Sequence, residues 1–215
     1  MTDMNTEQTV LQLRETMSLN LSEFERIPID DAALRSAAVA IVVVESLDDH
    51  RQHDFLLTRR GGTMRRHRGQ WALPGGRADE GENAQQTARR ELAEELGLSV
   101  GGEQVLGLLD DYPTRSGFCV TPVVIWGGRV ETLQPDPDEV AAVYRVPLSD
   151  LEHPEIPTLE RIPQSDRPVL SIPVASIEQT VFAPTAAMIY QFREVALHAR
   201  HTRVAEYEQP VFAWK

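Results

Sequence analysis

Three glutamates within five residues are the side chains in this sequence most able to do chemistry. Glu91, Glu94 and Glu95 are spaced by three and four. On a helix turning about 100° per residue, Glu94 and Glu95 fall on either side of Glu91 within one narrow arc. Like charges at this spacing destabilise a helix by a few tenths of a kcal/mol per pair. A hard divalent cation such as Mg²⁺ or Mn²⁺ would neutralise and gather them, so the cluster predicts a metal site.

A helix over residues 83–96 must position these carboxylates. Gly97 follows it as a stop signal. Leu92 and Leu96 point away from the acidic arc and predict the side that packs on a core. Arg90 lies beside the cluster, and its planar fork can hold a carboxylate in one rotamer. The alternative is that the acids only decorate a solvated surface.

Composition limits the partners that this chain can take. It has 215 residues and a formal net charge of -12, which argues against a bulk nucleic-acid binder and against binding to an anionic membrane. A small anionic substrate stays open, because metal ions and a few arginines can hold it. The N-terminus lacks a basic-then-apolar signal, and no apolar run approaches the roughly 18–20 residues of a membrane span. A cytoplasmic protein is the expectation.

The remaining elements read as one mixed α/β domain. An amphipathic helix is expected over 6–26, because Val10, Leu13, Met17, Leu21 and Phe24 recur at helical spacing. A basic, glycine-bearing loop covers 61–70, and the proline-rich region 152–173 reads as an irregular excursion. A second long helix is expected over 183–200 with Pro184 at its start, followed by a tail that docks. Strands are expected over 36–46, 55–60, 104–112, 117–128 and 139–148.

The acidic stretch resembles a known family signature. The chain has Gly76, five residues, Glu82, seven residues, and then Arg90-Glu91-Leu92-x-Glu94-Glu95-x-Gly97-Leu98. This spacing is similar to the signature of the Nudix hydrolases at each fixed position. The resemblance implies an α/β/α sandwich with a mixed sheet, here with an extra N-terminal helix and a C-terminal helical extension. It also implies metal-dependent cleavage of a nucleoside diphosphate linked to another group.

Carried over by position, the resemblance implies a ligand set for Mg²⁺ or Mn²⁺. Glu91, Glu94 and Glu95 would bind the metal through their carboxylates. A backbone carbonyl of Gly75 or Gly76 would be a further ligand, since a turn without Cβ atoms lets the backbone come close.

Catalytic and structural roles follow from the same resemblance. Glu94 and Glu95 would serve the reaction, with Arg90 orienting a glutamate. Glu82 would tie the loop to the helix, and Gly97 would end the helix. Bound metal lowers the pKa of a water, a glutamate takes its proton, and attack at one phosphorus expels the other phosphate.

The general base is predicted to lie outside the signature. Glu139 is the candidate, because it follows the loop "QPDPD" and opens a strand. A carboxylate at a loop–strand junction can reach over a site. Asp136 and Asp138 are rivals for the role, and the alternative is that all three are solvated loop acids.

The segment before the signature resembles the coenzyme A diphosphatase branch of the family. Leu56, Leu57, Thr58, Arg60, Arg65, His67, Gly69, Pro74, Gly75 and Gly76 fall in register with that branch. Arg60, Arg65 and His67 would contact substrate phosphates. Gly61 stands in place of the branch's usual serine, and Leu73 in place of its phenylalanine.

These features together define the expected organisation and partners. Residues 1–35 would form an N-terminal helical extension, 36–151 the hydrolase core, and 152–215 a C-terminal extension packed on it. The substrate would be coenzyme A or an acyl derivative. ADP-ribose, a dinucleotide or a nucleoside triphosphate is the rival substrate, and a non-catalytic nucleotide sensor is the rival function. The partner is a small nucleotide diphosphate, with no nucleic acid and no membrane, and a homodimer is left open.

Overall fold

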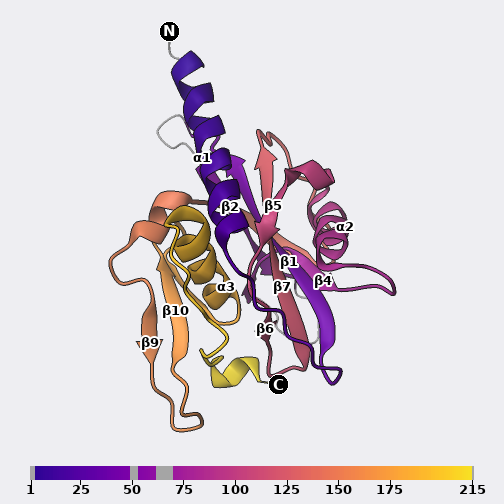
Figure 1. Cartoon of the computed structure of the whole chain (residues 1–215), viewed down its shortest axis with the longest axis vertical. Coiled ribbons are helices and arrows are strands. Elements are labelled where there is room, and N and C mark those ends of the chain that lie inside the picture. Colours follow the sequence, from indigo (N-terminus) through magenta and orange to yellow (C-terminus); the bar gives the residue numbers. More distant parts are fainter. Residues whose placement is uncertain (1–2, 49–52, 62–69, 215) are drawn as a thin grey trace.

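The computed structural model describes residues 3–48, 53–61 and 70–214, and side chains from residue 11 onward within these ranges. Its centre is a mixed sheet (Figure 1). The strands of this sheet are β1 (Arg35–Glu45), β2 (His53–Arg60), β3 (Trp71–Ala72), β4 (Gly75–Arg77), β5 (Val105–Leu108), β6 (Tyr112–Pro113), β7 (Phe118–Gly128) and β8 (Val140–Pro147). β1 pairs in parallel with β7 and antiparallel with β2 and β4, while β8 pairs antiparallel with β2.

Helices cover both faces of this sheet, which gives the α/β/α sandwich that the sequence predicted. Helix α2 (Ala84–Leu96) lies on one face, and α1 (Asp3–Glu23) and α3 (Thr185–Phe192) lie on the other (Figure 1). β1 is buried on both faces, as its nearly continuous apolar sequence indicates. Val42 packs toward α2, and Ile41 toward α1 and α3. Single-turn helices lie at Gly102–Gln104, Leu148–Glu152, Ala175–Ile177 and Val211–Ala213.

Local signals define α2 at both ends. Asn83 caps its start, and a reciprocal pair of hydrogen bonds with Gln86 completes a capping box. Gly97 ends it in the left-handed conformation with φ 66°, and a Cβ there would lie 2.8 Å from the Cβ of Gln134. Leu92 and Leu96 are fully buried. The predicted helix, its stop and its core face are therefore confirmed.

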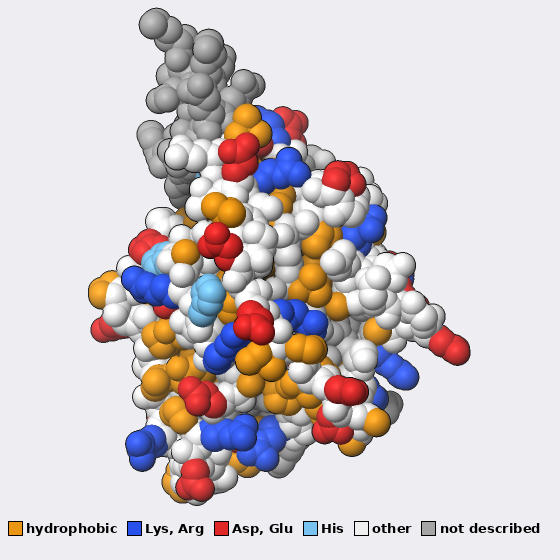
Figure 2. Space-filling view, in the orientation of Figure 1, with side chains coloured by type: hydrophobic (Ala, Val, Ile, Leu, Met, Phe, Trp, Pro, Cys, Tyr) orange, Lys and Arg blue, Asp and Glu red, His pale blue; other side chains and the backbone are white. Residues whose placement is uncertain are grey.

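Helix α1 buries the side that its periodicity predicted. Met17, Leu21 and Phe24 are buried against the core, although Phe24 lies just beyond the helix end. None of the described helices is long and apolar enough to cross a membrane. The face shown in Figure 2 mixes acidic, basic and apolar side chains.

Two expectations for the C-terminal part are wrong. Region 152–173 is not simply irregular, because β9 (Thr158–Glu160) and most of β10 (Val169–Val174) lie in it and form a second sheet with β11 (Gln179–Phe182). β9 is three residues long, Thr-Leu-Glu, and wholly exposed, so it is too short to show the alternation that marks a strand.

The second long helix is also shorter than expected. α3 ends at Phe192, and the chain continues as a π-helical turn over Arg193–Leu197. Glu194 is buried in this turn and pairs with Arg193 and Arg200. The tail after it docks as predicted, with Val204 and Ala213 buried.

Candidate active site

The acidic signature folds as strand, loop and helix, and its two glycines lie in β4 against β1. Gly75 has φ 151°, and a Cβ there would be 2.3 Å from the carbonyl oxygen of Ala38. No side chain fits in that space. The glycine therefore lets β4 approach β1 closely.

Two of the three predicted metal ligands converge on these glycines. The carboxylate of Glu91 lies so close to Gly76 that a Cβ on that residue would be 2.5 Å from Oε1. Glu95 is 7% exposed, and its Oε2 accepts a hydrogen bond of 3.2 Å from the amide of Gly75. Residues 75–76 and the last turns of α2 thus bring two carboxylates together.

Burial perturbs both of these acids. It raises the pKa of Glu91, with hydrogen bonding to Arg90 acting in the opposite direction. Burial raises the pKa of Glu95 to about 7, while the positive charge of Arg60 and the Gly75 amide act against it. Desolvated carboxylates of this kind gain from an added positive charge.

Arg90 is the hub that connects loop and helix. Its Nε donates to Glu82 Oε1 at 2.8 Å, and its Nη1 donates to Glu91 Oε1 at 2.9 Å and to Glu94 Oε2 at 2.8 Å. Glu82 also accepts from the Asp79 amide and from the hydroxyl of Thr87. The Arg90 hydrogen bond is the main reason that the pKa of Glu82 is lowered to about 2. Glu94, with 60% of its side chain exposed, points toward Arg90 rather than toward the glycines.

Glu139 comes to this site from a distant loop. The amides of Gln134 and Asp136 donate to the carbonyls of Leu96 and Glu95, each at 2.9 Å, and so fasten the loop to the end of α2. The carbonyl of Glu139 accepts from the Gly61 amide at 2.7 Å.

Among the three candidate bases, Glu139 is the one whose charge is among the main influences on Glu91 and Glu95. Its negative charge raises the pKa of both Glu91 and Glu95. Asp136 Oδ1 instead accepts from the amide of Asp138 within the loop, at 2.9 Å. The fold therefore brings Glu139 within electrostatic reach of both carboxylates.

The predicted substrate contacts are only partly visible. Arg60, the last residue of β2, is close enough for its charge to lower the pKa of Glu95. Arg65 and His67 lie outside the described residues.

Comparison with known proteins decides the family. The NUDIX domain model matches residues 34–170. The chain belongs to the Nudix family. It is 37% identical over 161 residues to an uncharacterized Nudix hydrolase NudL of Pectobacterium atrosepticum, covering 73% of this chain and 80% of that protein. The Nudix hydrolase 3 of Caenorhabditis elegans is 35% identical over 143 residues, covering 65% of this chain and 58% of that protein.

The named relatives are hydrolases, and this Nudix chain is a hydrolase that acts on diphosphate bonds. Among solved structures, a MutT/nudix family protein from Enterococcus faecalis is 20% identical and has a TM-score of 0.49. The match covers 78% of this chain and 63% of that one. This likeness is too low to add to the family assignment.

The chemistry of the site suits the divalent metal that Nudix hydrolases generally use. Glu91 and Glu95 are desolvated and supply hard oxygen ligands. The backbone of Gly75 and Gly76 lies next to these carboxylates and carries no side chains. Over the described ranges, no three His, Cys, Asp or Glu side chains are yet grouped closely enough to hold an ion. Glu94 would have to turn from Arg90 to join Glu91 and Glu95.

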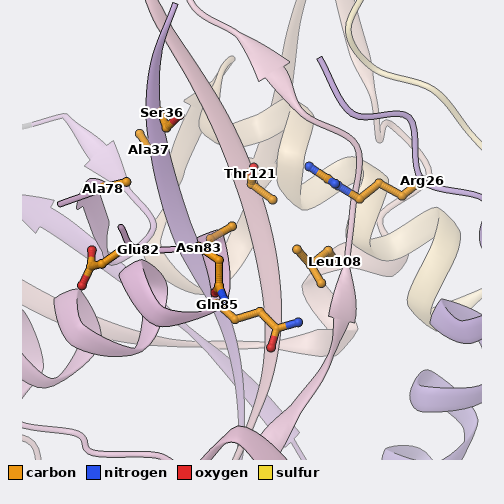
Figure 3. A pocket seen from close by; sticks show the side chains of 10 residues that line it. Arg26, Ser36, Ala37, Ala78, Glu82, Asn83, Gln85, Leu108 and Thr121 are labelled. Carbon is orange, nitrogen blue, oxygen red and sulfur yellow. The ribbon is translucent and has the colours of Figure 1, made fainter. Parts of the chain in front are cut away.

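A pocket that the sequence did not reveal lies beside the first turn of α2 (Figure 3). Its volume is about 470 Å³, and Arg26, Asn83, Gln85, Leu108 and Thr121 are on its walls. No motif marks it, because these residues come from four separate parts of the chain. Glu82 of the acidic signature is on its wall, whereas Glu91, Glu94 and Glu95 are not, so the pocket lies on the Glu82 side of the carboxylate site.

Proposed function

We propose that this Nudix hydrolase cleaves the diphosphate of a nucleoside diphosphate linked to a second group, with Mg²⁺ or Mn²⁺ as cofactor. The observation that carries the proposal is the pair of desolvated carboxylates, the partly buried Glu91 and the buried Glu95, gathered against Gly75 and Gly76. Two desolvated acids with raised pKa values are costly unless a cation joins them. A divalent ion that takes this place would also bind the substrate's diphosphate.

The bound metal supplies charge withdrawal from the phosphoryl oxygens and activation of a water. Glu91, Glu94 and Glu95 would hold it, with a carbonyl of Gly75 or Gly76. Arg90 would keep the rotamer of Glu91 through its hydrogen bond to Oε1.

Two residues beyond the ligand set would complete the site. Glu139 would take the proton from the attacking water, because its charge acts on both Glu91 and Glu95 from outside the ligand set. Arg60 would stabilise negative charge on the phosphate that leaves or on the one attacked.

Coenzyme A or an acyl-coenzyme A is the substrate that we propose first. It would be cut to 3′,5′-ADP and a 4′-phosphopantetheine moiety. Support comes from the residues before the acidic signature, which match that branch's motif in spacing, and from Arg60, whose positive charge reaches Glu95. ADP-ribose, dinucleotides and nucleoside triphosphates are the competing substrates.

We also propose that residues 36–151 form the hydrolase core, with 1–35 and 152–215 as extensions packed on it. Supporting contacts run from both extensions to the core. Gln191 Nε2 donates to Asp110 Oδ2 at 2.8 Å, and Arg203 donates to the same carboxylate. The amide of Ile27 donates to Asp110 Oδ1 at 2.7 Å.

The test is a screen of diphosphate compounds with product masses, run with Mg²⁺ and with Mn²⁺. Glu94→Gln and Glu95→Gln should each lower kcat by more than about 10²-fold while the fold is kept, because each loses a charged ligand. Glu80→Gln is the matched control, since Glu80 is an exposed acid of the same signature, in the loop before α2.

Near-parent turnover by both variants at saturating Mg²⁺ would reject the metal assignment. A far higher kcat/KM for ADP-ribose or a nucleoside triphosphate than for coenzyme A would reject the substrate. Absence of metal-dependent turnover on any compound, together with tight nucleotide binding, would favour the sensor.

A further inference from the structure

Strand β2 ends in two arginines that face opposite sides of the sheet. Arg60 pairs in register with Val140, whose side chain packs on the α2 side, and its charge acts on Glu95. Arg59 pairs in register with Trp71 of β3 and Ala142 of β8. Directly paired residues share a face of a sheet, so Arg59 and Trp71 project together on the side away from α2.

The guanidinium of Arg59 is not paired with an acid among the residues that the structure describes. Its side chain is exposed, and it has no hydrogen-bond or ion-pair partner among the residues that the structure describes. Other arginines are held by acids: Arg26 by Asp111, Arg90 by Glu82, Arg115 by Glu208 and Arg203 by Asp110. In a chain of net charge -12, a free guanidinium next to the active-site strand end is suited to an anion from solution.

An aromatic pair lies beside this arginine on the same face. The rings of Trp71 and Tyr144 meet edge to face, with centroids 4.9 Å apart and planes at 69°. Both residues are only partly buried. The carbonyl of Trp71 accepts a hydrogen bond of 3.2 Å from Thr185 Oγ1 at the start of α3, so the C-terminal extension holds this edge of the surface.

A cation beside partly exposed aromatic rings matches the chemistry of a nucleotide. Bases stack on aromatic side chains, and a phosphate pairs with a guanidinium. Because Arg59 and Arg60 are consecutive and point to opposite faces, a ligand held by both would extend from one face of the sheet to the other. The chain continues from Arg60 into Gly61. This residue packs against the loop before β8, where a Cβ would be 3.1 Å from the carbonyl oxygen of Asp138.

Resting on the proposed function, we infer that Arg59, Trp71 and Tyr144 form a subsite for the nucleotide half of the substrate. The base stacks on the Trp71–Tyr144 pair, and Arg59 binds a phosphate of the same nucleotide. The diphosphate to be cleaved stays on the opposite face, at Glu91 and Glu95. The subsite therefore selects substrates that carry a base, and the C-terminal extension contributes to that selection through Thr185.

The first experiment measures binding without turnover, by calorimetry in Mg²⁺. The probes are AMP, which has a base and a phosphate but no diphosphate, and ribose 5-phosphate, which lacks the base. Arg59→Ala should weaken AMP binding about tenfold or more, as expected for a lost charge-assisted hydrogen bond. Trp71→Leu and Tyr144→Leu should weaken AMP about fivefold or more but leave ribose 5-phosphate unchanged.

Arg161→Ala is the matched control, because Arg161 is an exposed arginine in the loop after β9, outside the main sheet. It should bind both probes as the parent does. Unchanged AMP binding by Arg59→Ala, which removes an exposed side chain and leaves the core intact, would overturn the subsite. Equal loss of AMP and ribose 5-phosphate binding in both aromatic variants would overturn the stacking role.

Turnover separates this inference from the proposed function. With the diphosphate substrate found in the screen, Arg59→Ala should raise KM about tenfold and leave kcat within about twofold, whereas Glu95→Gln should lower kcat. If Glu95→Gln is inactive and Arg59→Ala keeps the parent KM, the subsite is wrong and the hydrolase assignment stands. If no compound is cleaved but AMP binding still depends on Arg59 and Trp71, the subsite stands and the proposed reaction is wrong.

Discussion

A single methyl group at Gly76 should separate activity from stability in this protein. The Cβ of Gly76→Ala would lie 2.5 Å from Oε1 of Glu91, where an ordinary contact is 3.4 Å or more. The carboxylate must therefore retreat by about 0.9 Å. Displacement of a reacting geometry by about 1 Å can cost roughly 10²-fold in rate. We expect kcat of Gly76→Ala to fall by about that factor.

Stability should change little in Gly76→Ala, because the displaced atoms are the end of a flexible side chain. Gly76 is not among the residues of positive φ, so alanine brings no backbone strain there. Gly75→Ala should instead destabilise the fold, since its Cβ would meet backbone atoms of Ala38 and Val39 at 2.3 and 2.6 Å, at φ 151°. Gly102→Ala is the control, as its Cβ would find only Arg89 Nη1 at 3.8 Å.

The assay pairs steady-state kinetics at saturating Mg²⁺ with thermal unfolding of each variant. Parent-like kcat in Gly76→Ala would refute the view that the position of the Glu91 carboxylate matters to the reaction. A loss of Tm as large as that of Gly75→Ala would show that the backbone, rather than the carboxylate, had been displaced.

Three further changes have defined outcomes. Glu139→Gln should lower kcat by about 10²–10⁴-fold and move the acidic limb of the pH–rate profile, while Mg²⁺ affinity in titrations stays the same. Unchanged kcat and profile would assign the general base to a glutamate of the signature, to Asp136 or to Asp138. The hydrogen bond from Arg115 is the main cause that lowers the pKa of Glu208 from 4.5 to about 2, so its stabilisation is complete above pH 4.5 and is lost as the pH falls toward 2. Urea unfolding should therefore show Glu208→Gln about 1.5–3 kcal/mol less stable at pH 6, and the difference should shrink by pH 3; a gap that does not depend on pH would contradict this. Leu92→Ala, which truncates a fully buried side chain between α2 and the sheet, should cost about 2–5 kcal/mol in the same assay, and a loss below 1 kcal/mol would show that the site collapses.

Sequence alone determined the parts of this protein that local chemistry controls. The span of α2, its stop at Gly97 and its buried Leu92 follow from helical spacing and a glycine. The family also follows from spacing within one loop and helix, and the NUDIX domain match confirms it. The roles of the individual site residues stay predictions.

Tertiary structure decided what depends on contacts between distant residues. Glu139 was only one of three acids in a loop until the hydrogen bonds of that loop to Leu96 and Glu95 brought it within electrostatic reach of the box carboxylates. The second sheet was missed because β9 is wholly exposed, and only its pairing with β10 makes it a strand. Strand alternation sends Arg59 and Arg60 to opposite faces, but only the pairing of β2 with β3 and β8 decides which of them lies on the α2 side. Strand pairing and loop anchoring join residues far apart in the chain, so no local pattern encodes them.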